Sequence, residues 1–346
     1  MEIEVALRQQ VAKAVGKQAA GGKLEKLPGH ASNRSYYRMG EYPNSVLLMV
    51  MPPHASKQSE EASREETAAE LPFLNIQRYL KGLEVRVPQI LQYDEAAAVL
   101  VMEDLGNLTF ETALGRTESA ETLYPKAIDL LAHLRAASER NPDPNCLAFT
   151  RSFDQELYDW ELHHFREFGM EAWSGKRPSQ SERAELDQIF RRLSNLLSLE
   201  PKGFTHRDYQ SRNIMIKDGE LVVIDFQDAL LGPRQYDLVA LLRDSYVELE
   251  WSFVDRMLDR YLAAFERESG EKIPPQPFKA FFDLLTIQRK LKDAARFEYI
   301  YRVKGNPSFL PSIPASLRYA SLALQRRLDF SDLQDIAARY VPALAR

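Results

Sequence analysis

Three side chains in the middle of the chain have the types and spacing that phosphoryl transfer requires. Asp208 follows His206 and Arg207, Asn213 comes shortly after it, and Asp225 lies in the segment Ile-Asp-Phe. In phosphoryl transfer from ATP, one carboxylate orients the acceptor hydroxyl and takes its proton, while a side-chain amide and a second carboxylate hold Mg²⁺ on the phosphates. Asp208, Asn213 and Asp225 supply these groups in this order. The pattern therefore indicates a kinase that uses ATP and Mg²⁺.

The segment between Asn213 and Asp225 predicts a β-hairpin that brings these two residues together. Two apolar strands, Ile214–Ile216 and Leu221–Ile224, flank Asp218-Gly219. Asp-Gly between apolar runs favours a type I′ turn, because both central residues of that turn take positive φ. A chance His-Arg-Asp-x-x-x-x-Asn in a chain of this length is about a one-in-a-thousand event. Because the motif and the predicted hairpin agree, we interpret the three residues as catalytic and metal-binding and not merely as residues that form turns or cap helices.

The elements that must position these residues change in character after Glu103. The first part predicts a helix over 4–19, five strands (one ending near Leu27, then Tyr36–Met39, Ser45–Met51, Gln89–Tyr93 and Ala98–Met102) and a helix over Leu71–Leu83. The second part predicts helices over 118–138, 153–168, 180–198, 235–266, 276–302, 315–327 and 331–344, with a β-rich island at 203–226. We therefore expect an α+β fold with an N-lobe over 1–103 and a C-lobe over 104–346.

Composition restricts the possible partners and location. The net charge is −5 over 346 residues, which disfavours a nucleic-acid binder that works by bulk charge. One cysteine, Cys146, cannot form an intramolecular disulfide or a Cys-rich zinc module. No apolar run approaches a transmembrane length, and the N-terminus does not resemble a signal peptide. We expect a cytoplasmic enzyme with a small-molecule acceptor and no nucleic-acid or membrane partner.

The sequence resembles the aminoglycoside phosphotransferase/choline kinase branch of the protein-kinase-like fold. Most of the chain resembles one subgroup, the bacterial anomeric amino-sugar kinases, which phosphorylate N-acetylmuramate and N-acetylglucosamine at C1 in cell-wall recycling. The segments that carry the resemblance are SNRSYYR (32–38), VLLMVMPP (46–53), PFLNIQRYL (72–80), VPQIL (87–91), LVMEDLG (100–106), HRDYQSRNIMI (206–216), IDFQDALLGPRQYDLVALLRDSY (224–246) and QRKLKDAARF (288–297).

The resemblance implies a two-lobed kinase with ATP and Mg²⁺ as cofactors and an amino sugar as acceptor. It implies that Asp208 is the catalytic base and that Asn213 and Asp225 are metal ligands. The other implied roles are a phosphate loop formed by Asn33, Arg34 and Ser35, and a hinge, Glu103, Asp104 and Leu105, whose backbone meets adenine. We expect His206 to support the catalytic loop by hydrogen bonding, and Arg207 to be structural or to touch phosphate or substrate.

Two departures separate this chain from protein kinases. The strand at Val46–Pro53 lacks the lysine that pairs with the ATP phosphates in protein kinases, and the nearest lysine is Lys57. Arg34 and Arg38 are the candidates to replace it. Gln227 stands where a protein kinase has the glycine of Asp-Phe-Gly, which argues against a mobile activation loop.

Acceptor recognition leaves several readings open. Gln210, Asp228, Arg234, Trp160 and Arg289 are candidate acceptor contacts, with Arg234 or Arg289 as the cation for a muramate carboxylate and Trp160 as a stacking surface or a core residue. The acidic run at 154–161 keeps open an aminoglycoside or amino-alcohol kinase, since polycationic acceptors need carboxylates. A nucleotide-binding sensor without turnover is a third reading, and its only support is the missing strand lysine.

Overall fold

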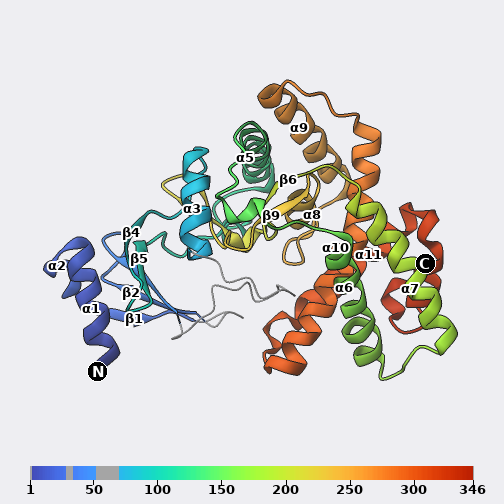
Figure 1. Cartoon of the computed structure of the whole chain (residues 1–346), viewed down its shortest axis with the longest axis horizontal. Coiled ribbons are helices and arrows are strands. Elements are labelled where there is room, and N and C mark those ends of the chain that lie inside the picture. Colours follow the sequence, from blue (N-terminus) through green and yellow to red (C-terminus); the bar gives the residue numbers. More distant parts are fainter. Residues whose placement is uncertain (1, 29–33, 52–69, 346) are drawn as a thin grey trace.

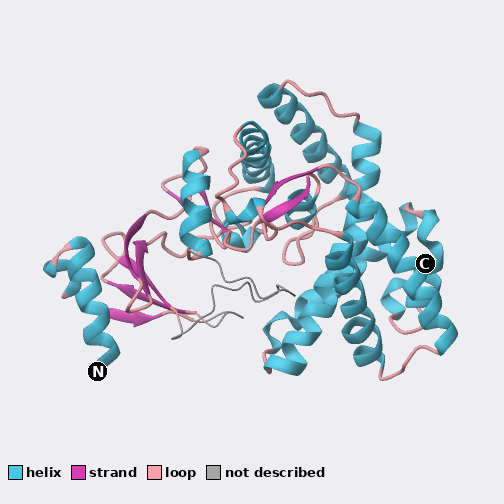
Figure 2. Cartoon of the chain, in the orientation of Figure 1, coloured by secondary structure: helices cyan, strands magenta, loops and turns pink. Residues whose placement is uncertain are grey.

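The computed structural model describes residues 2–28, 34–51 and 70–345, which form a sheet-containing N-lobe and a larger, mainly helical C-lobe (Figures 1 and 2). The N-lobe contains α1(Glu2–Val15), α2(Lys17–Ala20), β1(Leu24–Lys26), β2(Ser35–Met39), β3(Val46–Val50), α3(Pro72–Gly82), β4(Ile90–Asp94) and β5(Val99–Glu103). The C-lobe helices are α4(Phe110–Ala113), α5(Ala120–Arg140), α6(Gln155–His164), α7(Gln180–Ser198), α8(Tyr236–Leu242), α9(Trp251–Ser269), α10(Pro275–Lys304), α11(Ile313–Arg326) and α12(Ser331–Ala337). Its strands are β6(Lys202–Thr205), β7(Ile214–Lys217), β8(Glu220–Val223) and β9(Leu230–Pro233).

The N-lobe sheet confirms the five predicted strands. Its order is β1-β2-β3-β5-β4, and every neighbouring pair is antiparallel. Side chains alternate between the two faces of a strand. One face, including Met39, Leu48 and Val101, packs against Leu7 and Val11 of α1, and the other face joins the main hydrophobic core.

Helix α3 ties the sheet to the C-lobe. It begins at Pro72, as predicted, because proline is tolerated in the first turn where no backbone donor is needed. The ring of Phe73 lies 4.8 Å from that of Phe226, and Tyr79 donates a hydrogen bond of 2.9 Å to the carbonyl of Asn141. The same core cluster contains residues of both lobes, so the two lobes are packed together rather than joined only by a linker.

The hairpin formed by β7 and β8 confirms the prediction made from Asp218-Gly219. Both turn residues have positive φ, 53° and 81°. Ile214 pairs with Val223, and the N–H of Ile224 donates a 3.0 Å hydrogen bond to the carbonyl of Asn213. The backbone on either side of the hairpin is therefore joined, and Asn213 and Asp225 are held at the same end.

Three predicted helices are interrupted or shorter than expected, and one strand was missed. The predicted helix 4–19 is interrupted at Gly16, whose φ is 99°. The predicted helix 235–266 is two helices, α8 and α9, because Asp244 leaves the helical path and accepts hydrogen bonds from Ser211. Helix 331–344 is shorter than predicted, since α12 ends at Ala337 and Pro342 begins a separate short 3-10 helix. Strand β9, which pairs with β6, was not predicted, because its sequence Leu-Leu-Gly-Pro ends in residues typical of turns.

Helix 153–168 continues beyond α6 as a π-helix, η2(Phe165–Ala172). Gly169 permits this conformation, because a Cβ atom there would lie only 2.3 Å from the Phe165 ring. In the described part of the chain, none of the helices has the length and hydropathy needed to span a membrane.

Candidate active site

The structure brings Asp208, Asn213 and Asp225 together at the junction of the lobes. The Asn213 side-chain nitrogen donates to the Asp208 carbonyl at 2.9 Å and lies 3.4 Å from Oδ2 of Asp225. Both contacts use Nδ2, so Oδ1 of Asn213 remains as an oxygen donor beside the Asp225 carboxylate. This pair of oxygen ligands is of the type that Mg²⁺ prefers.

The catalytic loop after β6 is held by a buried carboxylate on α8. Asp237 accepts hydrogen bonds from the backbone N–H of His206 at 2.7 Å and of Arg207 at 2.9 Å. Asp208 N donates to His206 Nδ1 at 3.2 Å, so His206 carries its proton on Nε2, which lies 3.0 Å from the carbonyl of Ile224. Burial lowers the pKa of His206 and keeps the ring neutral. His206 therefore links the loop to the end of the hairpin.

Arg289 of α10 orients the carboxylate of Asp208. Its guanidinium is fully buried, donates to the Arg207 carbonyl at 2.8 Å and lies 3.2 Å from Oδ1 of Asp208. The ring of Tyr236 packs 4.7 Å from the same guanidinium. Arg289 is thus bound to the catalytic loop. Its guanidinium has no exposed surface, and the predicted contact with the acceptor stays a prediction.

Arg207 and Ser211 anchor the two ends of the same loop. Arg207 has φ 79°, a left-handed conformation that is uncommon for a residue with a side chain, and its buried guanidinium lies 3.9 Å from Glu161 of α6. Ser211 donates from its N–H (2.9 Å) and its hydroxyl (2.5 Å) to Asp244. Two acids distant in sequence, Asp237 and Asp244, therefore hold this loop. Neither acid was predicted to have this role, although an isolated acid in an apolar run is a signal of a buried partner.

Asp225 lies in a crowded electrostatic environment. The protein around it reduces its hydration, although part of the carboxylate reaches the surface, and the charges of Asp208 and Asp228 act in the same direction. Together they raise the pKa of Asp225 to about 6 against the opposing effects of Gln227 and Arg34. Gln227 donates to Asp225 at 2.9 Å and to Asp228 at 3.2 Å. A cation bound here would relieve the repulsion among these carboxylates.

The N-lobe contributes Arg34 and Tyr36 to the same space. Burial raises the pKa of Tyr36, and Arg34 and Asp225 are both close enough to shift it in opposite directions. Ser35 begins β2 and pairs with Val50. Two residues named from the sequence, Asn33 and Lys57, lie outside the described residues. Arg34 is therefore the cation that the structure places near Asp225.

Arg38 is not a phosphate-binding candidate, because it forms a buried ion pair with Asp104 in the hinge. The two guanidinium contacts are 2.5 and 2.9 Å, and Ser45 also donates to Asp104 at 2.5 Å. Glu103 is held by Arg86, by the N–H of Gln89 at 3.0 Å and by Lys217 at 2.9 Å. These contacts lower the pKa of Glu103 to about 2 despite its burial. The hinge side chains are therefore occupied by structural contacts, and a role in binding depends on their backbone.

The predicted acceptor residues separate into two groups. Gln210 lies on the catalytic loop and Asp228 beside Asp225, so both belong to the site. Arg234 does not, because it forms ion pairs with Glu139 at 3.0 Å and Glu271 at 2.7 Å. Trp160 stacks on His164 and lines a cavity of about 460 Å³ whose other lining residues come from α6, η2 and the α7 region. No residue of the catalytic loop lines that cavity.

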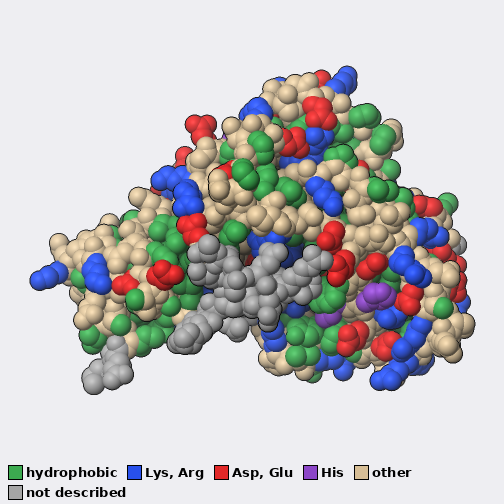
Figure 3. Space-filling model, in the orientation of Figure 1, with side chains coloured by type: hydrophobic (Ala, Val, Ile, Leu, Met, Phe, Trp, Pro, Cys, Tyr) green, Lys and Arg blue, Asp and Glu red, His purple; other side chains and the backbone are tan. Residues whose placement is uncertain are grey.

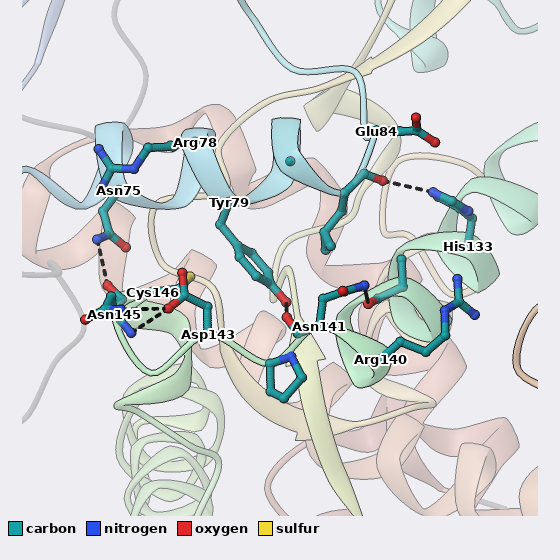
Figure 4. A pocket seen from close by; sticks show the side chains of 14 residues that line it. Asn75, Arg78, Tyr79, Glu84, His133, Arg140, Asn141, Asp143, Asn145 and Cys146 are labelled. Carbon is teal, nitrogen blue, oxygen red and sulfur yellow. Dashed lines mark hydrogen bonds between the residues drawn. The ribbon is translucent and has the colours of Figure 1, made fainter.

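A second cavity, of about 800 Å³, lies between α3 and the end of α5 and contains none of the predicted site residues (Figure 4). It is lined by Asn75, Tyr79, His133, Asn141 and Cys146, among others. Burial raises the pKa of Cys146 to about 11, so its thiol is unreactive at neutral pH.

Acidic and basic side chains are interspersed on the face shown in Figure 3. Within the described ranges, no group of three or more His, Cys, Asp or Glu residues is arranged to hold a metal.

The fold and site define a two-lobed phosphotransferase. The model of the phosphotransferase enzyme family matches residues 23–272, and the chain belongs to this family. The N-acetylmuramate/N-acetylglucosamine kinase of Neisseria meningitidis serogroup B is 33% identical over 78% of this chain and 79% of that protein. The enzyme of the same name from Pseudomonas aeruginosa is 30% identical over 89% of this chain and 86% of that protein.

Solved structures support the protein-kinase-like fold. The choline kinase LicA from Streptococcus pneumoniae has a TM-score of 0.62 at 13% identity, covering 94% of this chain and 98% of that chain. The ADP-bound aminoglycoside phosphotransferase APH(2'')-Ib has a TM-score of 0.54 at 14% identity, covering 91% and 98%. The resemblance to this branch and the fold class predicted from the sequence are confirmed.

Replacing Asp237 by Asn tests the role of the buried carboxylate. One of the two backbone N–H groups would then face an amide N–H instead of an acceptor, so we expect the unfolding free energy to fall by about 2–4 kcal/mol, together with turnover. Urea denaturation and a kinase assay measure the two effects. Asp332→Asn is the control, because its ion pair with Arg192 is on the surface and is worth about 0–1 kcal/mol. Equal stability and turnover in Asp237→Asn and wild type would contradict the assignment.

Proposed function

We propose that this chain transfers the γ-phosphoryl group of ATP to the anomeric hydroxyl of N-acetylmuramate or N-acetylglucosamine. The observation that carries the proposal is the juxtaposition of Asp208, Asn213 and Asp225 in a chain whose relatives are named N-acetylmuramate/N-acetylglucosamine kinases. The chemistry follows from the site, and the choice of acceptor follows from the relatives and from the groups that surround the site.

The nucleotide would lie between the hinge and the hairpin. Leu105 packs with Met215, Val222 and Ile224 in a small apolar cluster of the two segments, which is a suitable floor for adenine. The phosphates would then extend toward Asp225 and Arg34, whose guanidinium supplies positive charge where β3 has no lysine. The aminoglycoside phosphotransferase of similar fold was solved with ADP bound, which supports the use of a nucleotide.

Asn213 and Asp225 would hold Mg²⁺, because the two side chains lie together, the amide also carries an oxygen, and the carboxylate is destabilised without a counter-charge. When bound, Mg²⁺ neutralises the charge that develops on the transferred phosphoryl group. Gln227 would keep the Asp225 carboxylate in orientation through its 2.9 Å hydrogen bond.

Asp208 would take the proton of the acceptor hydroxyl. Arg289 occupies the side of its Oδ1, so Oδ2 is the oxygen left to face the acceptor. The neutral His206 has both ring nitrogens engaged and therefore supports the loop without moving a proton. An anomeric hydroxyl is more acidic than an ordinary alcohol, so a single carboxylate is a sufficient base.

Three of the four acids in the run at 154–161 are engaged within the protein, so they do not form an open carboxylate cluster of the kind that an aminoglycoside would need. Asp154 caps the helix by accepting from Leu157 N at 2.8 Å, and Asp159 accepts from Ser194 at 2.5 Å. Glu161 is buried against Gln288 at 2.6 Å and Arg207. These side chains are occupied inside the protein, which favours an acceptor bound by neutral hydrogen bonds, with Gln210 and Asp228 as its nearest candidate contacts.

Asp208→Asn should lower turnover by roughly 10²–10⁴-fold, the usual contribution of a positioned proton acceptor. Binding of ADP should change little, since Asp208 is not expected to contact the nucleotide. Steady-state kinetics and calorimetric titration with ADP measure the two quantities. Asp259→Asn, on the exposed side of α9, is the matched control. A variant that keeps the wild-type rate would remove Asp208 from the mechanism.

Asn213→Ala should raise the Mg²⁺ concentration that gives half-maximal rate, and Asp225→Ala should abolish activity at any practical Mg²⁺ concentration. The amide is one ligand among several, whereas the carboxylate supplies the negative charge. Initial rates over a Mg²⁺ series, beginning from EDTA-treated protein, make the measurement. Wild-type turnover that is the same with EDTA and with Mg²⁺ would show that the metal assignment is wrong.

A panel of acceptors tests the reaction itself. N-acetylglucosamine and N-acetylmuramate should consume ATP, while their 1-O-methyl glycosides should not, because the reacting hydroxyl is blocked. Kanamycin should be inactive, because the α6 carboxylates are already bonded. ADP release measured with a coupled assay gives all the rates. Turnover of kanamycin without turnover of either N-acetyl sugar would replace this proposal by the aminoglycoside alternative.

A further inference from the structure

One face of α10 carries polar residues into the interior beside Asp208. Gln288 lies four residues and Arg289 three residues before Lys292, so both are neighbours of Lys292 on this side of the helix. Gln288 and Arg289 are completely buried, and Gln288 bonds to Glu161 while Arg289 bonds to the catalytic loop. A buried helix face is normally apolar, because burying polar side chains costs free energy unless other interactions offset it.

Several polar atoms around this face lack a hydrogen-bond partner within the described residues. They include the Tyr236 hydroxyl, Oε1 of Gln288 and Nε of Arg289, all in fully buried side chains. Such an atom costs about 1–3 kcal/mol, and most buried polar atoms in proteins are paired. These unpaired atoms are grouped next to Asp208, the proposed base. Such a group indicates a site that binds the polar groups of a ligand or ordered water.

Lys292 is a cation at the edge of this group of unpaired polar atoms. Its side chain is 11% exposed, whereas Gln288, Arg289 and Tyr236 are buried completely. Its ammonium lies 3.4 Å from Oδ1 of Asp293, whose Oδ2 accepts a shorter bond of 2.6 Å from Lys290. An ammonium has three donors, and one long contact to a shared carboxylate leaves it capacity for another acceptor.

The electrostatic surroundings place Lys292 between α10, α6 and the start of α8. The groups that act on its charge are Tyr236, Asp293, Arg289 and Glu161. Burial disfavours the ammonium, but Tyr236 and Asp293 raise the pKa of Lys292 above its ordinary value, so it is charged at neutral pH. The two arginines considered from the sequence as carboxylate ligands, Arg234 and Arg289, are already bound within the protein.

We propose that Lys292 Nζ binds a carboxylate carried by the acceptor sugar, which makes it the residue that favours a sugar acid such as N-acetylmuramate over its neutral counterpart. This inference rests on the proposed function, because it assumes that the acceptor is an N-acetyl amino sugar with its C1 hydroxyl at Asp208. A charge-assisted contact at a partly buried site is worth about 10- to 100-fold in kcat/KM.

The test removes the charge from the ligand and from the protein in turn. N-acetylmuramate and its methyl ester are compared as acceptors, and the measured quantity is the ratio of their kcat/KM values. Wild type should prefer the acid by about 10- to 100-fold, and Lys292→Met should reduce this preference to within about threefold. Lys292→Arg should retain most of the preference. Lys279→Met, on the same helix but paired with Asp255 and Asp259, should leave the ratio unchanged.

A wild-type preference that persists in Lys292→Met would overturn the proposal. So would equal rates for acid and ester in wild type, a result that needs no variant and therefore holds even if Lys292→Met does not fold. Because the ratio compares two acceptors on one sample, partial unfolding lowers both rates without changing it. Wild type that phosphorylates neither N-acetylmuramate nor N-acetylglucosamine would contradict the proposed function instead, and N-acetylglucosamine distinguishes these outcomes.

Discussion

The carboxylate of Asp237 determines the conformation of the catalytic loop, and the other contacts of the site depend on it. By accepting the N–H groups of His206 and Arg207, it holds Arg207 at φ 79°, a conformation that costs of order 1–3 kcal/mol. In this conformation the Arg207 carbonyl accepts a hydrogen bond from Arg289, and the His206 ring lies beside the Ile224 carbonyl. The direction of Asp208, and so the reach of the proposed base, follows from this one cap.

Buried charged groups at the hinge also fix how the two lobes are arranged. The ion pair of Arg38 and Asp104 joins β2 to the hinge, and Lys217 joins the hairpin to Glu103 and to the Asp104 carbonyl at 2.9 Å. Buried ion pairs add little net stability because their desolvation offsets their attraction. They do fix geometry, since a misplaced partner leaves a buried charge unpaired. The N-lobe is thereby held over Asp225 with Arg34 in position.

The parts of the molecule that could be predicted depend on contacts between residues close in sequence. The parts that could not be predicted depend on contacts between residues far apart in sequence. The hairpin after Asn213 could be predicted because an Asp-Gly turn is decided by the local backbone. The partners of Asp237 and Arg289 could not, because they are 30 and 81 residues away in sequence, respectively. For the same reason the ion pairs of Arg234 with Glu139 and Glu271 could not be predicted, since its type and position do not reveal these partners. The lobe boundary at 103/104 and the roles of the site residues stay predictions.

Phosphorus NMR of the product formed from ATP and N-acetylglucosamine tests the central claim most directly, because it identifies the oxygen that attacked the phosphorus. The position of the new bond is what distinguishes an anomeric kinase from a kinase that phosphorylates another hydroxyl of the sugar. We expect a phosphate whose phosphorus couples to the anomeric proton H1. Coupling to the two protons at C6 instead, as in an ordinary sugar phosphate ester, would contradict it.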